Sequence, residues 1–457
     1  MNLFSFFTLA SSIISAFLCG VCPNSNYSMM ALLPIVFLII FYQLSRAYVY
    51  NNIRLTILVV GVCLWFRMVL IPLLGACDSS YFNKVNAEND AVQISLYLCL
   101  YESLVISFII YFLSGTYYVH RNRTKVLYGS KMVYALFIII AFVVYLSVGQ
   151  NYHIFEFAIK AIGTGERGEE ELDAKILLIR QIIGSGMLFA FFCLVEKCRQ
   201  KFCQSSRSIY VIYALVGAMF MVCIITGERR TSQIYIAFSA CWLLIHVFPS
   251  FKKKITVTIL FVGAFVLVMM SIYKHLNAFL YDSYTEALEH GDVGEGFSAT
   301  MFDAYFYGVN TISKNIEFGK ITDLSLFNFL YDIMRCTFGL NLFVPRDVHL
   351  TSEAYNLYMY GGYQTHGYLL SSVGYGYIYF GLVFAPVVTF INVFLLSFIE
   401  KRLKNAGSIE MTYIWAFIFM RFGFGILGSL PPLVSLCTRY IFFNGALYLL
   451  AKKINNR

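Results

Sequence analysis

The feature that most constrains this sequence is its series of apolar runs, each about 18 to 22 residues long. An α-helix needs about this length to cross a hydrocarbon core of about 30 Å. The composition agrees, because 59% of the residues are hydrophobic and only 13% are charged. An ordinary soluble domain has about 25% charged residues. The sequence therefore predicts an all-α polytopic membrane protein, and it lacks the alternating strands of outer-membrane barrels.

Twelve segments have the length and apolarity of transmembrane helices, and we predict that they form one integral membrane domain over residues 1–457. The predicted spans are about 3–20, 29–45, 55–76, 93–114, 132–149, 176–195, 209–226, 232–249, 255–274, 367–399, 411–428 and 432–451. The tenth is too long for one crossing, which indicates a tilted or surface-lying start. The first lacks the basic start and cleavage site of a signal peptide, so we interpret it as a retained helix.

Basic residues are concentrated in alternate loops and in the C-terminal tail, which fixes the predicted orientation. These segments hold more than half of the 34 lysines and arginines. The positive-inside rule assigns them to the cytoplasm, so both termini are predicted to be cytoplasmic. One large loop, 275–366, then faces the opposite, outer side. The net charge of +9 is accordingly a topology signal, and we predict no nucleic-acid partner.

The large loop has helical periodicity of its own. Segments 301–316 and 321–336 repeat apolar residues at three- and four-residue spacing, as amphipathic helices lying on a membrane face do. Its tyrosines, Tyr363 among them, fit either an aromatic belt at the interface or a carbohydrate groove. His349 and His366 are the two candidate proton acceptors of the loop.

Several arginines lie on the predicted outer side, where the orientation rule does not account for them. Four are inside spans, two end the seventh span and two are in the large loop: Arg67, Arg180, Arg421 and Arg439; Arg229 and Arg230; Arg335 and Arg346. Each could pair with a neighbour or snorkel to the interface. Glu102, the one acid inside the predicted spans, can pair with Arg67 but cannot neutralise all four. We therefore predict an outward-opening cationic cavity that binds an anionic amphiphile such as a lipid-linked diphosphate.

Two short motifs carry less weight. The tetrapeptide Thr-Gly-Glu-Arg occurs at 164–167 and at 226–229, but acids surround Arg167, whereas Arg230 follows Arg229. We interpret the repetition as coincidence and predict a substrate-binding role for Arg229. Cys19 and Cys22 form a C-x-x-C without a second pair of ligands, which favours packing over redox or metal chemistry. No D-x-D cluster occurs in the outer loops, and we predict neither a metal nor a cofactor.

Two longer stretches resemble a known family. THGYLLSSVGYGYIYFGLVFAPVV (365–388) resembles the segment leading into a late helix of Wzy-type O-antigen polymerases and the related O-antigen ligases. IITGERRTSQIYIAFSACWLL (224–244) is similar to their T-G-S-R helix end, with Arg229 at the matching arginine. The R-x10-G pattern of some members is absent at both Arg167 and Arg335.

The resemblance implies a GT-C-like, metal-independent inverting glycosyltransferase. Such an enzyme joins undecaprenyl-diphosphate-linked repeat units at the periplasmic face, among membrane lipids and with a chain-length regulator protein as a partner. It further implies that Arg229 and a loop arginine hold the diphosphate while His366 serves the acceptor. The segment GLNLFVPRDVHL favours Arg346 over Arg335 as that loop arginine.

Two other functions remain open at the level of sequence. An O-antigen ligase would use similar residues but would transfer the glycan to lipid A core. A lipid-linked glycan flippase or another secondary transporter would be expected to show two related halves and broken helices near the midplane. We find no convincing internal repeat, and the unusual cations lie to one side, which favours the glycosyltransferase.

Overall fold

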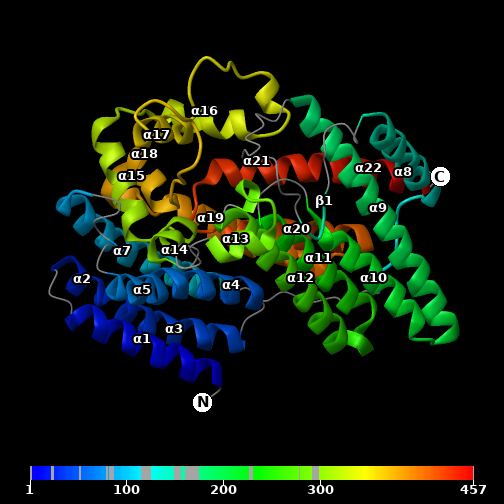
Figure 1. Cartoon of the computed structure of the whole chain (residues 1–457), viewed down its shortest axis with the longest axis horizontal. Helices are drawn as coiled ribbons and strands as arrows, with labels where there is room; N and C mark the ends of the chain where they lie inside the picture. The colour runs from blue at the N-terminus through cyan, green and yellow to red at the C-terminus, as the bar shows by residue number, and fades with distance from the viewer. Residues whose placement is uncertain are drawn as a thin grey trace. The chain divides into compact units, whose positions relative to one another are not determined.

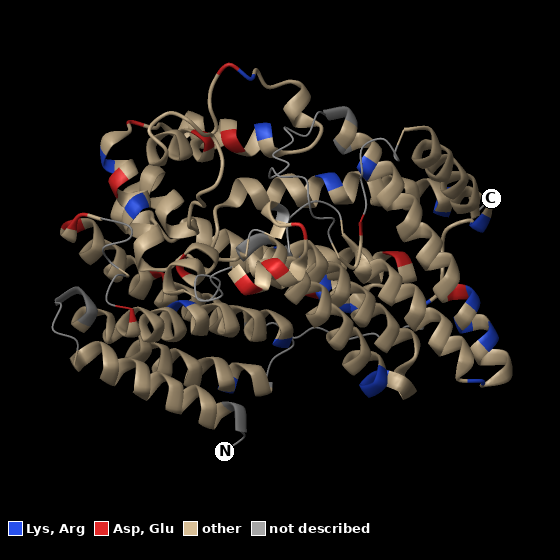
Figure 2. Cartoon of the chain, viewed as in Figure 1, with Lys and Arg blue, Asp and Glu red and all other residues tan. Residues whose placement is uncertain are grey.

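The computed structural model describes residues 3–21, 25–50, 53–78, 81, 87–114, 125–148, 156–159, 174–225, 230–276, 278–290 and 298–455. Nearly all regular structure in these residues is helical (Figure 1). The strands of the described chain are two short ones, β1 (Glu156–Phe157) and β2 (Ile224–Ile225), which pair antiparallel. Charged side chains are sparse on most of the helices (Figure 2).

Six helices of the described chain are long and apolar enough to cross a membrane. They are Ser28–Val49, Arg54–Cys77, Asn89–Leu113, Leu178–Ser205, Pro249–Tyr273 and Leu430–Asn455. A seventh is added if α18 (Ser372–Phe384) and α19 (Val387–Asn405), which are bent by 113° at their junction, count as one broken span. The prediction of an all-α chain with membrane-crossing helices is thus confirmed. The number twelve and the orientation stay predictions.

The chain divides into two compact units, each built from separated stretches of sequence. Unit 1 consists of Met1–Val119, Phe297–Lys401 and Arg421–Arg439, and unit 2 consists of His120–Gly296, Arg402–Met420 and Tyr440–Arg457. Both units combine contacts between neighbouring helices and contacts between distant ones. Examples are α8 (Lys131–Ser147) with α9 (Ala174–Ser205), and α15 (Val309–Ile321) with α7 (Asn89–Ser114). Each unit is described by itself below.

Unit 1 begins with an N-terminal group of apolar helices. These are α1 (Leu3–Val21), α2 (Ser25–Met30), α3 (Leu32–Tyr50), α4 (Arg54–Trp65), η1 (Phe66–Leu70), α5 (Ile71–Cys77) and α7 (Asn89–Ser114). The element η1 is a single π-helical turn that joins α4 to α5 without a break in the rod. An inserted π turn changes which side chains face the neighbouring helices. Here it contains Arg67, which is directed into the unit and is only 2% exposed.

The rest of unit 1 contains most of the predicted outer loop. Its helices are α14 (Ala299–Phe306), α15 (Val309–Ile321), α16 (Leu326–Cys336), η6 (Leu340–Leu342) and α17 (Thr351–Met359), followed by α18, α19, the end of α20 (Ile409–Phe424), and α21 (Leu430–Tyr440). Helix α15 packs against α7 and α18. Both loop segments with helical periodicity are therefore helical, as predicted.

The first of these segments breaks into two helices at Tyr307. Tyr307 adopts a left-handed conformation with φ of 54°, which stops α14. The Asp303 carboxylate then accepts hydrogen bonds from the backbone N–H groups of Asn310 (3.2 Å) and Thr311 (2.8 Å). These are among the first N–H groups of α15, which have no partner inside their own helix. One buried acid thus ends one helix and starts the next.

Unit 2 is a second group of apolar helices. These are α8 (Lys131–Ser147), α9 (Ala174–Ser205), α10 (Ile209–Cys223), α11 (Arg230–Val247), η3 (Pro249–Phe251), α12 (Lys252–His275), η4 (Ala278–Leu280), α13 (Tyr284–His290), η7 (Ile441–Gly445) and α22 (Ala446–Asn455), with the first part of α20. Phe189, Phe192 and Tyr413 are buried in its core. The Glu410 carboxylate accepts hydrogen bonds from the Gly129 N–H (2.9 Å) and the Tyr134 hydroxyl (3.0 Å), which joins α20 to the start of α8.

Candidate functional site

Unit 1 contains a cavity of about 230 Å³ in which three arginines meet. It is lined by Arg335, Cys336, Phe338, Asn341, Arg346, Leu350, Ser435 and Arg439. These residues come from the end of α16, the segment between α16 and α17, and α21. All three arginines were predicted from sequence as cations that orientation does not account for. We call this space the arginine cavity.

Hydrogen bonds hold the two sides of the arginine cavity together. The Phe338 N–H donates to Thr438 Oγ1 at 3.0 Å, which ties the segment after α16 to α21. The Tyr331 hydroxyl bonds the carbonyl oxygens of Pro345 (2.7 Å) and Val348 (2.9 Å). The stretch that carries Arg346 is therefore held against α16, although its residues form no regular helix beyond η6.

Glu353 forms an ion pair with one of the cavity arginines and lies close to His349. Its Oε1 lies 3.4 Å from Arg335 Nη2, its Oε2 lies 3.6 Å from His349 Nδ1, and Oε2 also accepts the Leu350 N–H at 2.8 Å. Among the described residues, Glu353 is the one acid that forms an ion pair with a cavity arginine, and its partner is Arg335. Glu353 alone cannot balance three guanidinium groups.

A second acid, Asp332, lies on α16 one helical turn before Cys336 and joins this helix to its neighbours. It is 2% exposed and accepts hydrogen bonds from the Thr351 N–H (3.1 Å) and the Tyr375 hydroxyl (2.8 Å). Burial raises the pKa of Asp332, and the hydrogen bonds partly offset that increase. Asp332 thereby connects α16 with α17 and α18.

Cys336 lines the arginine cavity but is not suited to nucleophilic chemistry. Burial raises the pKa of its thiol to about 12, with Asp332 adding to the increase. The thiolate is the reactive form of cysteine, so the side chain stays a thiol near neutral pH. Cys336 therefore offers the arginine cavity no thiolate nucleophile near neutral pH.

The predicted pair between Arg67 and Glu102 is present in unit 1. Arg67 Nη1 contacts Glu102 Oε2, and Glu102 Oε1 accepts hydrogen bonds from the hydroxyls of Ser372 (2.7 Å) and Thr389. Both charged side chains are buried, at 2% and 0% exposure. Arg67 therefore takes part in a buried network that joins η1, α7, α18 and α19, and it does not line the arginine cavity.

The other predicted cations lie elsewhere. Arg421 is near the end of α20 and does not line the arginine cavity, while Arg180 is half-buried on α9 of unit 2. Arg230 begins α11, but its side chain lies outside the described residues. Arg229 and Arg167 also lie outside them, so the predicted difference between the two T-G-E-R stretches stays a prediction. Cys19 is buried with its thiol 3.4 Å from the Pro72 carbonyl oxygen, and Cys22 is outside the described residues.

His366 and Tyr363 lie in the exposed segment between α17 and α18. Gly361 and Gly362 turn the chain there with φ of 61° and 95°, a conformation that glycine adopts without strain. Tyr363 is 95% exposed, and the Gln364 side chain donates to the His366 carbonyl oxygen at 2.6 Å. Neither residue lines the arginine cavity, whereas His349 is joined to it through Glu353.

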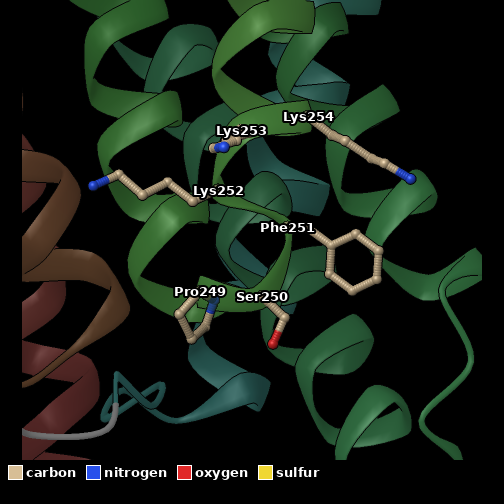
Figure 3. Close-up of a pocket in the computed structure, with 6 residues that line it drawn as sticks. All are labelled: Pro249, Ser250, Phe251, Lys252, Lys253 and Lys254. Carbon is tan, nitrogen blue, oxygen red and sulfur yellow. The ribbon is translucent and has the colours of Figure 1, made fainter.

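A larger space of about 500 Å³ lies in unit 2 at the start of α12. Its lining includes Lys252, Lys253 and Lys254, but Figure 3 shows the side chains of Lys252 and Lys254 pointing to opposite sides. These lysines belong to a basic segment that the positive-inside rule already accounts for. We therefore do not treat this space as the functional site.

The sequence did not single out two neutral polar members of the arginine cavity, Asn341 and Ser435. Ser435 and Arg439 are four residues apart on α21, which places them on one face of that helix. Asn341 lies in η6, where no periodic pattern marks it. The i, i+4 spacing of Ser435 and Arg439 was the one signal that could have been used. Comparison of the chain with protein-family models, with curated proteins and with solved structures gave no match.

Proposed function

We propose that this chain is a membrane glycosyltransferase that polymerises oligosaccharide repeat units carried on undecaprenyl diphosphate. The product would be an O-antigen or capsule-type polysaccharide. The observation that carries the proposal is the meeting of Arg335, Arg346 and Arg439 in one cavity of a chain with membrane-crossing helices. The family resemblance of segments 224–244 and 365–388 supports the same activity.

The chemistry of the arginine cavity suits a diphosphate. A guanidinium group presents two parallel N–H donors that match two phosphate oxygens, and it stays charged at any physiological pH. Ser435 and Asn341 add neutral hydrogen-bonding groups to the same lining. When the bond between sugar and diphosphate breaks, negative charge develops on the leaving phosphate, and fixed cations stabilise that charge most in the transition state.

In the proposed reaction, a hydroxyl of one repeat unit attacks the anomeric carbon of another. The new C–O bond forms as the bond from that carbon to the diphosphate oxygen breaks. The carrier lipid leaves as its diphosphate anion, held by the arginines. A histidine removes the proton of the attacking hydroxyl as a general base.

Two histidines remain candidates for that base. The family resemblance favours His366, which precedes α18. The geometry around the arginine cavity supports His349, because its ring is 3.6 Å from Glu353, the acid paired with Arg335.

The finer topology also belongs to this proposal. Twelve spans, cytoplasmic termini and a periplasmic site would place the arginine cavity at the outer leaflet of the inner membrane. That location fits a substrate presented from the periplasmic side and a chain-length regulator as a partner. Arg229 and Arg230 would add cations to the substrate path, and Tyr363 would offer an aromatic face to a sugar ring.

The test uses the purified full chain in lipid vesicles with undecaprenyl-diphosphate-linked repeat units as the sole substrate. The expected product is a ladder of longer glycans on the carrier lipid. Substituting the catalytic histidine by alanine should remove the ladder, so His349→Ala and His366→Ala are compared side by side. A ladder of normal length in both variants would refute the assignment of the base.

Two further arms separate the alternatives. Transfer only when lipid A core is added would indicate an O-antigen ligase. Movement of the lipid-linked substrate across the vesicle membrane without any new glycosidic bond would indicate a transporter. Either result would replace the polymerase proposal.

A further inference from the structure

The side of α16 that faces away from unit 1 is apolar and exposed. Leu326, Phe327, Leu330 and Met334 are 57%, 71%, 57% and 44% exposed. Positions 326, 330 and 334 are spaced by four residues, so they form one stripe along the helix. On the other side, Tyr331 and Asp332 are buried. Figure 1 shows α16 beside α17 at the edge of the unit, with α1 at the opposite edge.

This stripe leads to the arginine cavity. Its last member, Met334, directly precedes Arg335 and Cys336, and Phe338 follows them in the cavity lining. On the far side of η6, Leu342 and Phe343 are 79% and 83% exposed next to Arg346. An apolar surface therefore adjoins a cationic cavity over a few residues.

The helix cannot itself cross a membrane. Its 11 residues span about 16 Å, roughly half the thickness of a hydrocarbon core. No charged side chain lies on the exposed stripe. Of the charged residues of α16, Asp332 is buried on the other side and Arg335 lines the arginine cavity. The unit that carries α16 also contains helices that are long and apolar enough to cross a membrane. Lipid chains are thus the apolar phase available to this helix.

We infer that the exposed stripe of α16 holds the apolar chain of an anionic phosphate lipid whose head group lies in the arginine cavity. The lipid reaches the cavity sideways from the bilayer along Leu326, Leu330 and Met334. The inference rests on the anion-binding cavity of the proposed function but does not depend on glycosyl transfer. It defines the ligand as an amphiphile in which phosphate and chain are both recognised.

The experiment measures binding to the full chain in detergent micelles or nanodiscs. Three ligands are compared: undecaprenyl diphosphate, inorganic pyrophosphate and uncharged undecaprenol. The expected order is tightest binding for undecaprenyl diphosphate. Leu330→Asn should weaken that binding about tenfold, since burial of one leucine side chain against the ligand is worth about one decade in affinity. Pyrophosphate, which has no chain, should bind the variant and the wild-type protein equally.

A matched control is Leu288→Asn, at a leucine of α13 that is 48% exposed and lies in unit 2. It should leave the affinity for undecaprenyl diphosphate unchanged. A second measurement needs no variant: an undecaprenyl phosphate with a photoreactive group in its chain should cross-link to residues 326–334 of the wild-type protein. Cross-links confined to other helices would overturn the inference.

The remaining outcomes are also decisive. Equal binding of undecaprenyl diphosphate by Leu330→Asn and by the wild type would overturn the inference. If Leu330→Asn instead changes the oligomeric state without changing the lipid affinity, the stripe is a protein interface and the inference is also overturned. If the wild-type chain forms polymer but Leu330→Asn does not change the affinity for undecaprenyl diphosphate, the proposed function stands and this inference is refuted. If Leu330→Asn weakens lipid binding but the wild-type chain forms no polymer, this inference stands and the proposed function is refuted.

Discussion

Glu353 holds Arg335 through an ion pair of 3.4 Å between Oε1 and Nη2, directly behind the arginine cavity. The carboxylate neutralises part of the charge that an anionic ligand would otherwise meet. Replacing it by an amide should therefore strengthen anion binding. Both side chains are partly exposed, at 26% for Glu353 and 18% for Arg335. Pairs of this kind are worth about 0.2–1 kcal/mol, so Glu353→Gln should tighten inorganic pyrophosphate binding by up to about fivefold.

The substitution keeps the shape of the side chain and its bond to the Leu350 N–H. Calorimetric titration with pyrophosphate measures the change. Glu88→Gln is the control, because Glu88 pairs with Lys320 at 3.6 Å in the same unit but does not line the cavity. Weaker binding by Glu353→Gln would mean that Glu353 serves chiefly to orient Arg335.

Arg439 contributes a guanidinium group to the cavity from α21, a helix different from the one that carries Arg335. Hydrogen bonds to charged groups are worth about 1.5–3 kcal/mol, so Arg439→Ala should weaken pyrophosphate binding about 10- to 100-fold. Arg439→Lys should fall between alanine and wild type, because lysine keeps the charge but loses the two-pronged contact. Equilibrium binding at fixed ionic strength provides the measurement. Lys254→Ala, in the other space, should bind pyrophosphate as the wild type does.

The buried pair of Arg67 and Glu102 makes a prediction about stability. Glu102→Ala leaves the Arg67 guanidinium buried without its counter-charge, a change that typically costs about 3–5 kcal/mol. The thermal midpoint of the detergent-solubilised protein should fall clearly. The double variant Arg67→Met, Glu102→Leu should recover most of the loss, since no unpaired charge remains. If the double variant is as unstable as the single one, the hydroxyls of Ser372 and Thr389 depend on the carboxylate more than Arg67 does.

Asp332 makes stability depend on pH. Burial raises its pKa in the folded chain above the ordinary aspartate value, so the folded state favours the protonated form. The protonated Asp332 contributes to the free energy of unfolding. This contribution is fully present below the pKa of Asp332 in the unfolded chain, about 3.9, and is lost as the pH rises through its pKa in the folded chain. Asp332→Asn cannot ionise. Its thermal midpoint relative to wild type should therefore rise from pH 4 to pH 7, whereas a constant difference would show that Asp332 does not titrate in this range.

The helices of this chain were predictable because the length and apolarity of each run are local properties of the sequence. The predicted partnership of Arg67 with Glu102 also held, since two charges in adjacent apolar spans have few other ways to avoid an uncompensated cost. The 113° bend between α18 and α19 was anticipated only as an excess of length. The spacing of Ser435 and Arg439 could be read from sequence, but not that α21 would meet the end of α16. Contacts between helices that are distant in sequence depend on tertiary packing, and local sequence patterns do not predict them.

The hydrogen bond from the Phe338 N–H to Thr438 joins two residues that are 100 positions apart. One side of the arginine cavity is therefore synthesised about 100 residues before the other. A growing chain that has already released α16 from the ribosome still lacks Ser435 and Arg439. The cavity is completed only when α21 has been synthesised and has packed against the segment that follows α16.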